Sequence, residues 1–289
     1  EGATQEELDF VRSVATQSSV EAKVSFGTSG WRGELGTEFT MRNVQVVATA
    51  IVEMYKTADD ELFGHLGVAS FAEFAQDGIV LGHDNRMMGP EFAMAIAGVF
   101  LAHDIKVYYG GEATTPEFSA SIEVLGAAAA LNITPSHNPA NYSGLKFNPR
   151  DGGPAGPEIT TVITQIANHK MTDFVYEELG SSGVERFDIL EAYHKFLKQR
   201  GTLDLERIAE FVQSDQVAVV IDHVHGATRG RPDRLLNGAQ ELITLRTEDN
   251  VLFGGIAPEP SSKNFTGVKE AIAAAKAPLK VGAIFDPDG

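Results

Sequence analysis

The hexapeptide TPSHNP at Thr134–Pro139 places a serine hydroxyl between two prolines. Proline fixes its own φ angle, so the two rings restrict the backbone on both sides of Ser136 and present the hydroxyl at a defined angle. His137 and Asn138 add hydrogen-bonding groups beside it, and Lys146 follows ten residues later. The same letters also suit an ordinary polar turn. The hexapeptide therefore indicates a candidate nucleophile and leaves the structural alternative open.

A pair of carboxylates occurs in the final four residues, Asp286-Pro287-Asp288-Gly289. Alternate residues of an extended segment point to the same side, so Asp286 and Asp288 could converge on one hard cation. Two carboxylates with a phosphate oxygen and waters suit Mg²⁺. A simple Asp-Gly turn after a strand is the alternative, and it is common.

A glycine-rich segment, FGTSGWRG, covers Phe26–Gly33. Its glycines let the backbone approach a ligand closely, and Arg32 supplies a planar fork that suits phosphate. No Gly-Lys-Ser/Thr follows the glycines, so the segment is not a Walker loop. No strand clearly precedes it, which argues against a dinucleotide-binding fingerprint. A tight structural turn is the alternative interpretation.

Several other residues that could take part in chemistry are interpreted mainly as structural. We expect Asp84 and Arg86 to form an ion pair that braces Thr134–Pro139, the segment that we call the serine loop. Trp31 suits a buried anchor as well as it suits stacking on a sugar. His223 and His225 lie two residues apart after a predicted strand. We interpret both as hydrogen-bonded structural residues.

The elements that position these residues follow from hydrophobic periodicity. Strands are predicted at 79–81, 105–109, 127–133, 217–222, 242–245 and 281–285. Helices are predicted at 41–58, 90–103, 116–124, 157–170, 189–199, 205–212, 231–236 and 268–275. This alternation indicates βαβ units and mainly parallel sheets. Ligands of such sheets bind at the carboxyl ends of the strands, and the serine loop follows one of those ends.

The chain length and one glycine- and serine-rich segment predict the domain organisation. A chain of 289 residues favours two domains. The segment GSSG at Gly180–Gly183 is the best candidate hinge. We therefore predict an α/β protein with two consecutive α/β domains and mixed, mainly parallel sheets. Residues 1–185 form the catalytic domain with the serine loop, and residues 186–289 form a domain with the carboxylate pair.

Composition excludes several classes of function. The net charge of −17 argues against nucleic-acid binding and against anionic membrane surfaces. Such a chain binds an anionic substrate only where a few cations are concentrated. The absence of cysteine excludes disulfides and thiolate chemistry. No apolar run approaches the ~20 residues of a membrane span, and no signal peptide is visible, so we expect a cytoplasmic protein. The oligomeric state is not predicted.

Taken together, the three motifs resemble the α-D-phosphohexomutase superfamily, which includes phosphoglucomutases, phosphomannomutases and phosphoglucosamine mutases. The family's opening signature, Phe-Gly-Thr-Ser/Asp-Gly-x-Arg-Gly, is similar to Phe26–Gly33. Its active-site loop, Thr-x-Ser-His-Asn-Pro, is similar to Thr134–Pro139, and the following Gly-x-Lys to Gly144–Lys146. Its metal loop, Asp-x-Asp-x-Asp-Arg, is similar to the chain at Asp286 and Asp288.

The resemblance implies an activity and a role for each matched residue. Members of the family are intramolecular phosphotransferases that interconvert hexose 1-phosphate and hexose 6-phosphate through a phosphoserine and a bisphosphate intermediate. By resemblance, Ser136 would carry and transfer the phosphoryl group. Lys146 and Arg32 would neutralise phosphate charge, and Lys146 would also assist proton transfer. His137 would orient the sugar or the phosphoserine.

The resemblance also implies a cofactor and partners. Mg²⁺ would be held by Asp286, Asp288 and the phosphorylated Ser136. The partners would be a hexose phosphate and a hexose bisphosphate, with glucose favoured and mannose next. A phosphoserine carries roughly −1.5 to −2 charge at neutral pH. In so acidic a chain that charge requires local cations, which the resemblance supplies as Arg32, Lys146 and the metal.

The sequence departs from the family's pattern at its C-terminal end. The family has four domains, and this sequence resembles the first two. The third aspartate of the metal loop, the sugar-selecting loop and the phosphate-clamping loop are absent from the 289 residues. We therefore expect a truncated chain, a proteolytic fragment or the ordered part of a longer protein, with little mutase activity by itself. A non-catalytic sugar-phosphate or metal-binding module is the alternative. A phosphatase with Asp286 as nucleophile is weaker, because it leaves the serine loop unexplained.

Overall fold

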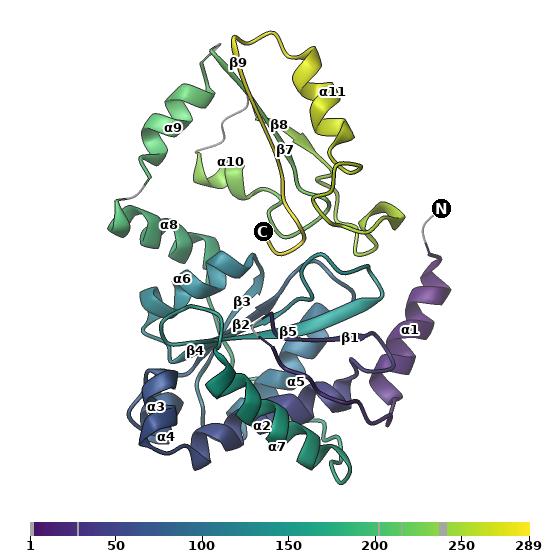
Figure 1. Ribbon diagram of the computed structural model, residues 1–289, viewed down its shortest axis with the longest axis vertical. Helices are drawn as coiled ribbons and strands as arrows, with labels where there is room; N and C mark the ends of the chain where they lie inside the picture. Colours follow the sequence, from purple (N-terminus) through teal and green to yellow (C-terminus); the bar gives the residue numbers. More distant parts are fainter. Residues whose placement is uncertain (1–2, 28, 202, 215, 237–241) are drawn as a thin grey trace.

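Two β-sheets, one above the other in Figure 1, organise the part of the chain that the structure describes. The structure is a computed structural model, and it describes residues 3–27, 29–201, 203–214, 216–236 and 242–289. Thr28, in the predicted glycine-rich segment, lies outside the described residues. Within these ranges no helix has both the length and the apolar character needed to cross a membrane.

The first sheet has six strands in the order β1-β5-β4-β2-β3-β6. The strands are β1 (Trp31–Glu34), β2 (Ile79–His83), β3 (Val107–Glu112), β4 (Ala129–Ile133), β5 (Tyr142–Pro149) and β6 (Glu185–Arg186). β2, β3, β4 and β6 are parallel, whereas β5 is antiparallel to both β4 and β1. The prediction of a mixed, mainly parallel sheet is confirmed.

Helices cover both faces of the first sheet. They are α1 (Gln5–Gln17), α2 (Met41–Thr57), α3 (Asp60–Leu66), α4 (Phe71–Asp77), α5 (Gly89–Leu101), α6 (Thr115–Leu125), α7 (Pro157–Met171) and α8 (Ile189–Arg200). On one face α2 packs between α5 and α7, and on the other α6 packs against α8. β2 is buried on both faces because Ile79 and Leu81 join the larger core and Val80 joins the smaller one.

The second sheet has three parallel strands in the order β8-β7-β9 among the described residues. Its strands are β7 (Val217–Asp222), β8 (Leu242–Leu245) and β9 (Leu279–Ile284). The accompanying helices are α9 (Leu205–Val212), α10 (Arg231–Leu235), the short 3₁₀ helix η1 (Phe253–Gly255) and α11 (Thr266–Ala274). The bounds of α9 and β7 coincide with the predicted ones.

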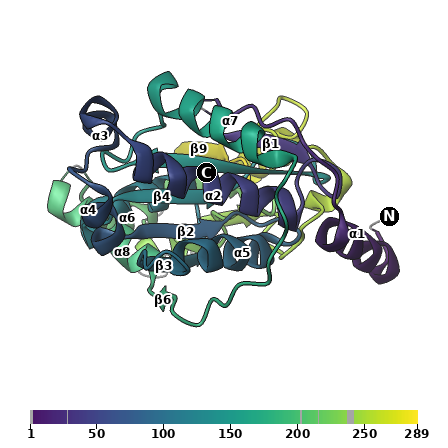
Figure 2. The same ribbon diagram turned by 90° about the horizontal axis from the view of Figure 1, so that it is seen from below.

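We call the six-stranded sheet with α1 to α8 the first unit, and the three-stranded sheet with α9, α10, η1 and α11 the second unit. The carboxyl ends of the parallel strands of both sheets point toward the junction between the two units. The C-terminus lies between the units in Figure 1, and it lies over the middle of the first sheet in the view from below (Figure 2). The loops that follow β2, β3 and β4 therefore face the residues that follow β9. This arrangement brings the two predicted motifs, the serine loop and the carboxylate pair, to one place.

The structure contains elements of the first unit that were not predicted, among them β1, β5, α3 and α4. Residues 31–34 of the glycine-rich segment, predicted as loop, form β1, in which Trp31 pairs with Leu145 of β5. The strand β5 itself was not predicted, because Gly144, Lys146 and Asn148 interrupt its apolar pattern. The helices α3 and α4 were not predicted either, since each has only seven residues.

The predicted division at residue 185 stays a prediction. The two residues of β6 lie at that division and pair with β3 of the first sheet. α8 follows the division and packs against α6. Both elements thus belong to the first unit, and the chain then continues into α9 and the second sheet.

Candidate active site

Ser136 lies just beyond the carboxyl end of β4 in an unusual backbone conformation. Its φ angle of 58° is in the left-handed region, which residues other than glycine rarely adopt. Its backbone N–H donates to Thr134 Oγ1 at 2.9 Å. Such conformations persist where the surroundings hold them, and they gather at functional sites. Contacts around Ser136 must therefore hold its backbone in this conformation.

The guanidinium of Arg86 holds the serine loop. It donates to the carbonyl oxygens of Ser136 at 2.6 Å, Asn138 at 2.7 Å and Pro139 at 2.8 Å. Its Nε lies 3.1 Å from Asp84 Oδ2, and the Arg86 side chain is 2% exposed. The predicted ion pair that braces the serine loop is therefore confirmed.

Burial dominates the electrostatics of this ion pair. It raises the pKa of Asp84 to about 7, although the neighbouring Arg86 charge acts in the opposite direction. Thr134 donates its hydroxyl to Asp84 Oδ2 at 2.8 Å, so the loop and the ion pair form one network. Phe253 of the second unit covers the guanidinium, with 4.8 Å between its ring centre and Arg86 Cζ.

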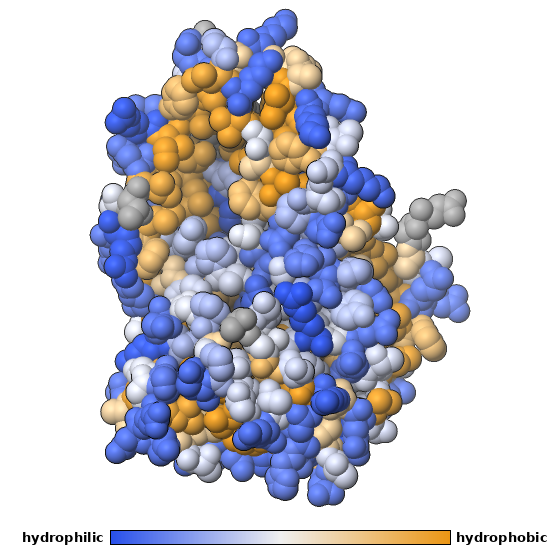
Figure 3. All heavy atoms as spheres, in the orientation of Figure 1, coloured by the Kyte–Doolittle hydropathy of each residue, from blue (hydrophilic) through white to orange (hydrophobic). Residues whose placement is uncertain are grey.

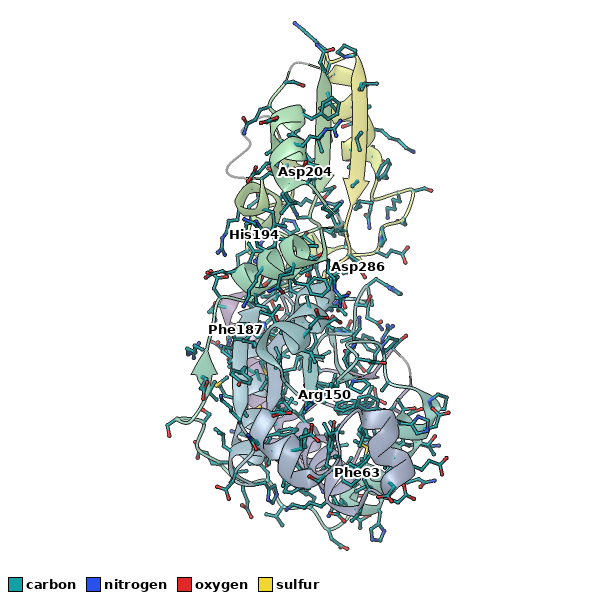
Figure 4. The ribbon with its side chains drawn as sticks, turned by 90° about the vertical axis from the view of Figure 1, so that its left-hand side faces the viewer. Phe63, Arg150, Phe187, His194, Asp204 and Asp286 are labelled. Atoms are coloured by element: carbon teal, nitrogen blue, oxygen red, sulfur yellow. The ribbon has the colours of Figure 1, made fainter. Side chains whose placement is uncertain are left out.

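The carboxylate pair meets Ser136 across the junction between the units. Ser136 Oγ donates to Asp286 Oδ2 at 2.6 Å, and Figure 4 shows Asp286 where the second unit reaches the first. Burial raises the pKa of Asp286, and the negative charge of Asp288 raises it further. A cation at this position would relieve that repulsion.

Asp288 is buried and has cationic and hydroxyl partners. Its Oδ2 is in close contact with Lys146 Nζ and accepts from Thr115 Oγ1 at 2.6 Å. Burial acts to raise the pKa of Asp288, but Lys146 and these hydrogen bonds hold it below its usual value. The register of the sheet places Lys146 of β5 opposite Asn132 of β4, and the ammonium lies beside Thr115 and Asp288.

Arg32 and His137 lie in different surroundings. Arg32 of β1 donates through Nη1 to Asn138 Oδ1 at 2.8 Å. Its buried Nε has no hydrogen-bond partner among the described residues, so one donor is left over. The His137 side chain is exposed and has no hydrogen bond within the same ranges. The structure thus brings Ser136, Asp286, Asp288 and Lys146 together, places Arg32 against the loop, and leaves the His137 ring in solvent.

The donor set suits a hard cation. Ser136 and the two carboxylates offer only oxygen atoms, which Mg²⁺ prefers, and Mg²⁺ commonly keeps several waters beside one or two carboxylates. No group of three or more His, Cys, Asp or Glu side chains with metal-binding geometry occurs in the described ranges. The oxygen atoms of Ser136, Asp286 and Asp288 are the donors that fit Mg²⁺.

Three further contacts join the units beside the site. Arg229, which follows β7, donates to Glu112 Oε1 at the end of β3 at 3.0 Å. Arg231 lies 3.3 Å from Glu117 Oε1, and the Glu117 side chain is 1% exposed. Asn85 also donates its amide across the junction. These contacts hold the Asp286 segment over the serine loop.

Several residues singled out in the sequence are structural. Trp31 is buried and stacks on Phe39 with 4.8 Å between ring centres, so it is an anchor and not a platform for a sugar. His223 Nδ1 contacts Thr228 Oγ1 at 2.8 Å. His225 Nδ1 contacts the carbonyl oxygen of Glu248 at 3.0 Å. The interpretation of both histidines as hydrogen-bonded structural residues is confirmed.

Sequence reasoning missed three residues of the site's surroundings: Thr115, Asn132 and Phe253. Thr115 carries the clearest signal, because a Thr-Thr-Pro sequence begins a helix directly after a parallel strand. That is the end of the strand at which ligands bind in such sheets. Asn132 is a polar residue inside an otherwise apolar strand. Phe253 gives no comparable signal, because its partner Arg86 is far away in the sequence.

Comparisons with known proteins agree with the motifs. Residues 23–173, just over half of the chain, match the family described as phosphoglucomutase/phosphomannomutase, alpha/beta/alpha domain I. The phosphoglucomutase of Staphylococcus epidermidis is 28% identical over 83% of this chain and 43% of its own length. A Schizosaccharomyces pombe protein described as a phosphoribomutase is 32% identical over 52% of this chain and 27% of its own.

The fold is shared with solved structures as well. A crystal structure described as a phosphomannomutase from Thermus thermophilus superposes with a TM-score of 0.73 and 29% identity. The match covers 93% of this chain and 56% of that protein. The chain therefore spans about half the length of the relatives it matches.

Proposed function

The chain belongs to the phosphoglucomutase/phosphomannomutase family, and we propose that it is the phosphoserine-bearing part of an intramolecular phosphotransferase. The proposed reaction interconverts hexose 1-phosphate and hexose 6-phosphate through a bisphosphate intermediate. The observation that supports it most is the hydrogen bond of 2.6 Å between Ser136 Oγ and Asp286 Oδ2. A serine in a braced, left-handed loop thereby meets a carboxylate that comes from the other unit.

Each transfer exchanges one P–O bond for another. A sugar hydroxyl oxygen attacks the phosphorus of phosphorylated Ser136, and the P–Oγ bond breaks with its electron pair on Oγ. The hydroxyl proton passes overall to Oγ, which leaves a serine hydroxyl and a hexose bisphosphate. After the sugar has turned over, the reverse exchange at its other phosphate restores the phosphoserine. Such transfers depend mainly on positioning and on charge neutralisation.

The side chains around Ser136 would supply both the positioning and the charge neutralisation. Lys146 lies beside the carboxylate pair, with its Nζ 3.3 Å from Thr115 Oγ1, and would neutralise phosphoryl charge. Arg32, which contacts Asn138 of the loop, would add a second positive charge for the phosphate. His137, exposed at the mouth of the loop, would contact the sugar. Asp286, Asp288 and the phosphoserine would hold Mg²⁺, which when bound draws negative charge from the phosphoryl oxygens.

Glucose phosphate is the proposed substrate, with mannose phosphate next. Relatives of the chain are named phosphoglucomutase and phosphoribomutase, and a structural neighbour is described as a phosphomannomutase. The sugar-selecting and phosphate-clamping loops that the resemblance leads us to expect do not occur in the 289 residues. We therefore propose that the 289 residues accept a phosphoryl group but turn over hexose phosphate poorly by themselves.

The serine assignment is tested by intact-mass analysis after treatment with glucose 1,6-bisphosphate. The unsubstituted chain should gain one phosphate, and Ser136→Ala should gain none. Ser143→Ala is the matched control, because the buried Ser143 hydroxyl has no partner among the described residues and lies outside the loop. Equal labelling of all three proteins would refute Ser136 as the phosphoryl carrier.

The need for further domains is tested by a coupled mutase assay. The 289-residue chain should be far slower than a full-length family member assayed beside it. Comparable turnover would contradict that need. Saturable sugar-phosphate binding without any phosphoryl exchange would instead favour the alternative, a non-catalytic binding module.

A further inference from the structure

Thr115, the first residue of α6, has a hydroxyl whose hydrogen-bonding capacity is fully used. The hydroxyl donates to Asp288 Oδ2 at 2.6 Å. It accepts from Asn132 Nδ2 at 3.1 Å and from Lys146 Nζ at 3.3 Å. A hydroxyl offers one donor and two lone pairs, so these three contacts complete it. Three different strands or loops thus meet at a single oxygen atom.

The chemistry of the partners fixes the direction of every bond. A carboxylate without a proton only accepts and an ammonium only donates, so the Thr115 proton points to Asp288. Asn132 must then present its amide N–H to the same oxygen. Its Oδ1 has no partner among the described residues, although Asn132 is 1% exposed. An unpartnered buried acceptor is unfavourable for folding, so the orientation of Asn132 serves the site.

The backbone of Thr115 also binds Asp288. Its N–H donates to the carbonyl oxygen of Asp288 at 2.8 Å. The first turn of α6 is itself fixed by a capping box between Thr114 and Glu117. One residue of the first unit therefore holds both the main chain and the carboxylate of a residue in the second unit.

We propose that Thr115 is a positioning residue for the Mg²⁺ site. Its hydroxyl sets the orientation of the Asp288 carboxylate and keeps Lys146 beside it, so that ligand and cation are in place before substrate arrives. Residues that orient metal ligands typically contribute about 10- to 100-fold to metal affinity. The inference rests on the proposed function, because it takes Asp288 as a Mg²⁺ ligand.

The test is a calorimetric titration of the 289-residue chain with Mg²⁺. Thr115→Val keeps the shape of the side chain and removes the hydroxyl, and it should raise the Mg²⁺ Kd about tenfold or more. Thr115→Ser restores the hydroxyl and should restore the Kd. Thr160→Val is the matched control, because Thr160 is a buried threonine of α7 that lies outside the site. It should leave the Kd unchanged.

The outcomes separate this inference from the proposed function. An unchanged Kd in Thr115→Val, with binding lost in Asp288→Asn, would overturn the role of Thr115 and leave the metal site intact. Equal weakening in the Val and Ser variants would also overturn it, because the hydroxyl would then be irrelevant. Should Thr115→Val not fold, Thr115→Ala gives the same comparison. Failure of the unsubstituted chain to bind Mg²⁺ would overturn the inference, whereas labelling of Ser136 would still test phosphoryl transfer.

Discussion

At the scale of single residues, one guanidinium determines the shape of the serine loop. Arg86 donates to carbonyl oxygens along the loop and pairs with Asp84, all in a buried position. Lysine would keep the charge but not the planar fork. The carbonyl oxygens it cannot reach would stay buried without a donor, and each such loss costs about 1 to 3 kcal/mol.

We predict that Arg86→Lys lowers the free energy of unfolding by about 3 kcal/mol or more, measured by urea denaturation. Arg12→Lys is the control, because Arg12 pairs with Asp9 and Glu91 while its own side chain is 48% exposed. An exposed pair of this kind should change stability by less than about 1 kcal/mol. Equal effects of the two substitutions would show that the fork of Arg86 is not needed.

His83 should make the fold sensitive to mild acid. Its ring is buried between the Asp84 carbonyl oxygen and the Tyr109 hydroxyl, and burial lowers its pKa below the ordinary value. Below about pH 6.5 the unfolded chain therefore binds a proton that the native state resists. By linkage the unfolding free energy falls as the pH falls from about 6.5 toward the native pKa.

We predict that His83→Gln loses less stability than the unsubstituted chain between about pH 7.5 and pH 5.5, measured as the change in Tm. Asp84 has a raised pKa and acts in the opposite direction, but it is present in both proteins. His65→Gln, at an exposed position, is the matched control. A pH dependence of His83→Gln that equals that of the unsubstituted chain would contradict the assignment.

The sequence singled out residues of the site more readily than it indicated their partners. Ser136, Asp286 and Lys146 were singled out because proline bracketing, alternation and motif order are local signals. The hydroxyl of Thr115 and the ring of Phe253 were missed, since their value depends on contacts across the junction. The bond between Thr115 and Asp288, for example, spans 173 positions. No local pattern encodes that proximity.

At the scale of elements, the short helix η1 packs against Arg86, the residue that holds the serine loop. Phe253 begins η1, is fully buried and has a φ angle of 53°. Its ring lies over Arg86 of the first unit. A left-handed phenylalanine is unfavourable by itself, so the packing of its ring must hold the backbone there.

We predict that Phe253→Ala lowers the free energy of unfolding by about 3 to 5 kcal/mol and that Phe253→Leu has a smaller effect. Urea denaturation measures both. Phe211→Ala is the matched control in the same unit, where the side chain is 47% exposed. It should cost less than about 1 kcal/mol. A small effect of Phe253→Ala would mean that the ring does not stabilise the junction.

Elements with a strong apolar pattern were predicted and those of mixed polarity were not. α9 was placed correctly because its apolar residues recur at helical spacing, and β7 because it is a short continuous apolar run. β1 and β5 carry the site's glycines and polar residues, which hide the strand pattern. α3 and α4 do have cap signals, with Asp59 before one and Gly67 after it, but the segment is too short and polar for periodicity to appear.

At the scale of the whole molecule, positively charged side chains gather near the serine loop although the chain as a whole is acidic. A chain of net charge −17 must concentrate cations to bind an anion. Arg86 and Arg32 contact the serine loop, and Lys146 pairs with Asp288 beside it, each from a separate strand or strand end. The composition predicted that cations would gather, but only the fold shows where they do. Polar side chains also occupy the surface between the units in Figure 3, whereas apolar ones gather over the second unit.

The apolar surface of the second unit follows from how its sheet is covered. Gly282 of β9 faces α11, because a side chain there would meet Val268 and Ile272. Leu279 and Val281 alternate with it and so point to the opposite face, where they are 55% and 54% exposed. β9 is also an edge strand among the described residues. An exposed apolar edge strand favours pairing between copies of the chain.

We therefore predict that the 289-residue chain self-associates as its concentration rises and that Val281→Lys suppresses this. A lysine on an edge strand places an unpaired charge in any strand-to-strand contact, which disfavours the contact. Val175→Lys is the matched control, because Val175 is 75% exposed in the segment after α7 and belongs to neither sheet. Sedimentation velocity over a concentration series distinguishes the three proteins. Because both substitutions add the same charge, an equal reduction would assign the effect to net charge, and only a larger reduction by Val281→Lys supports the β9 edge as the contact.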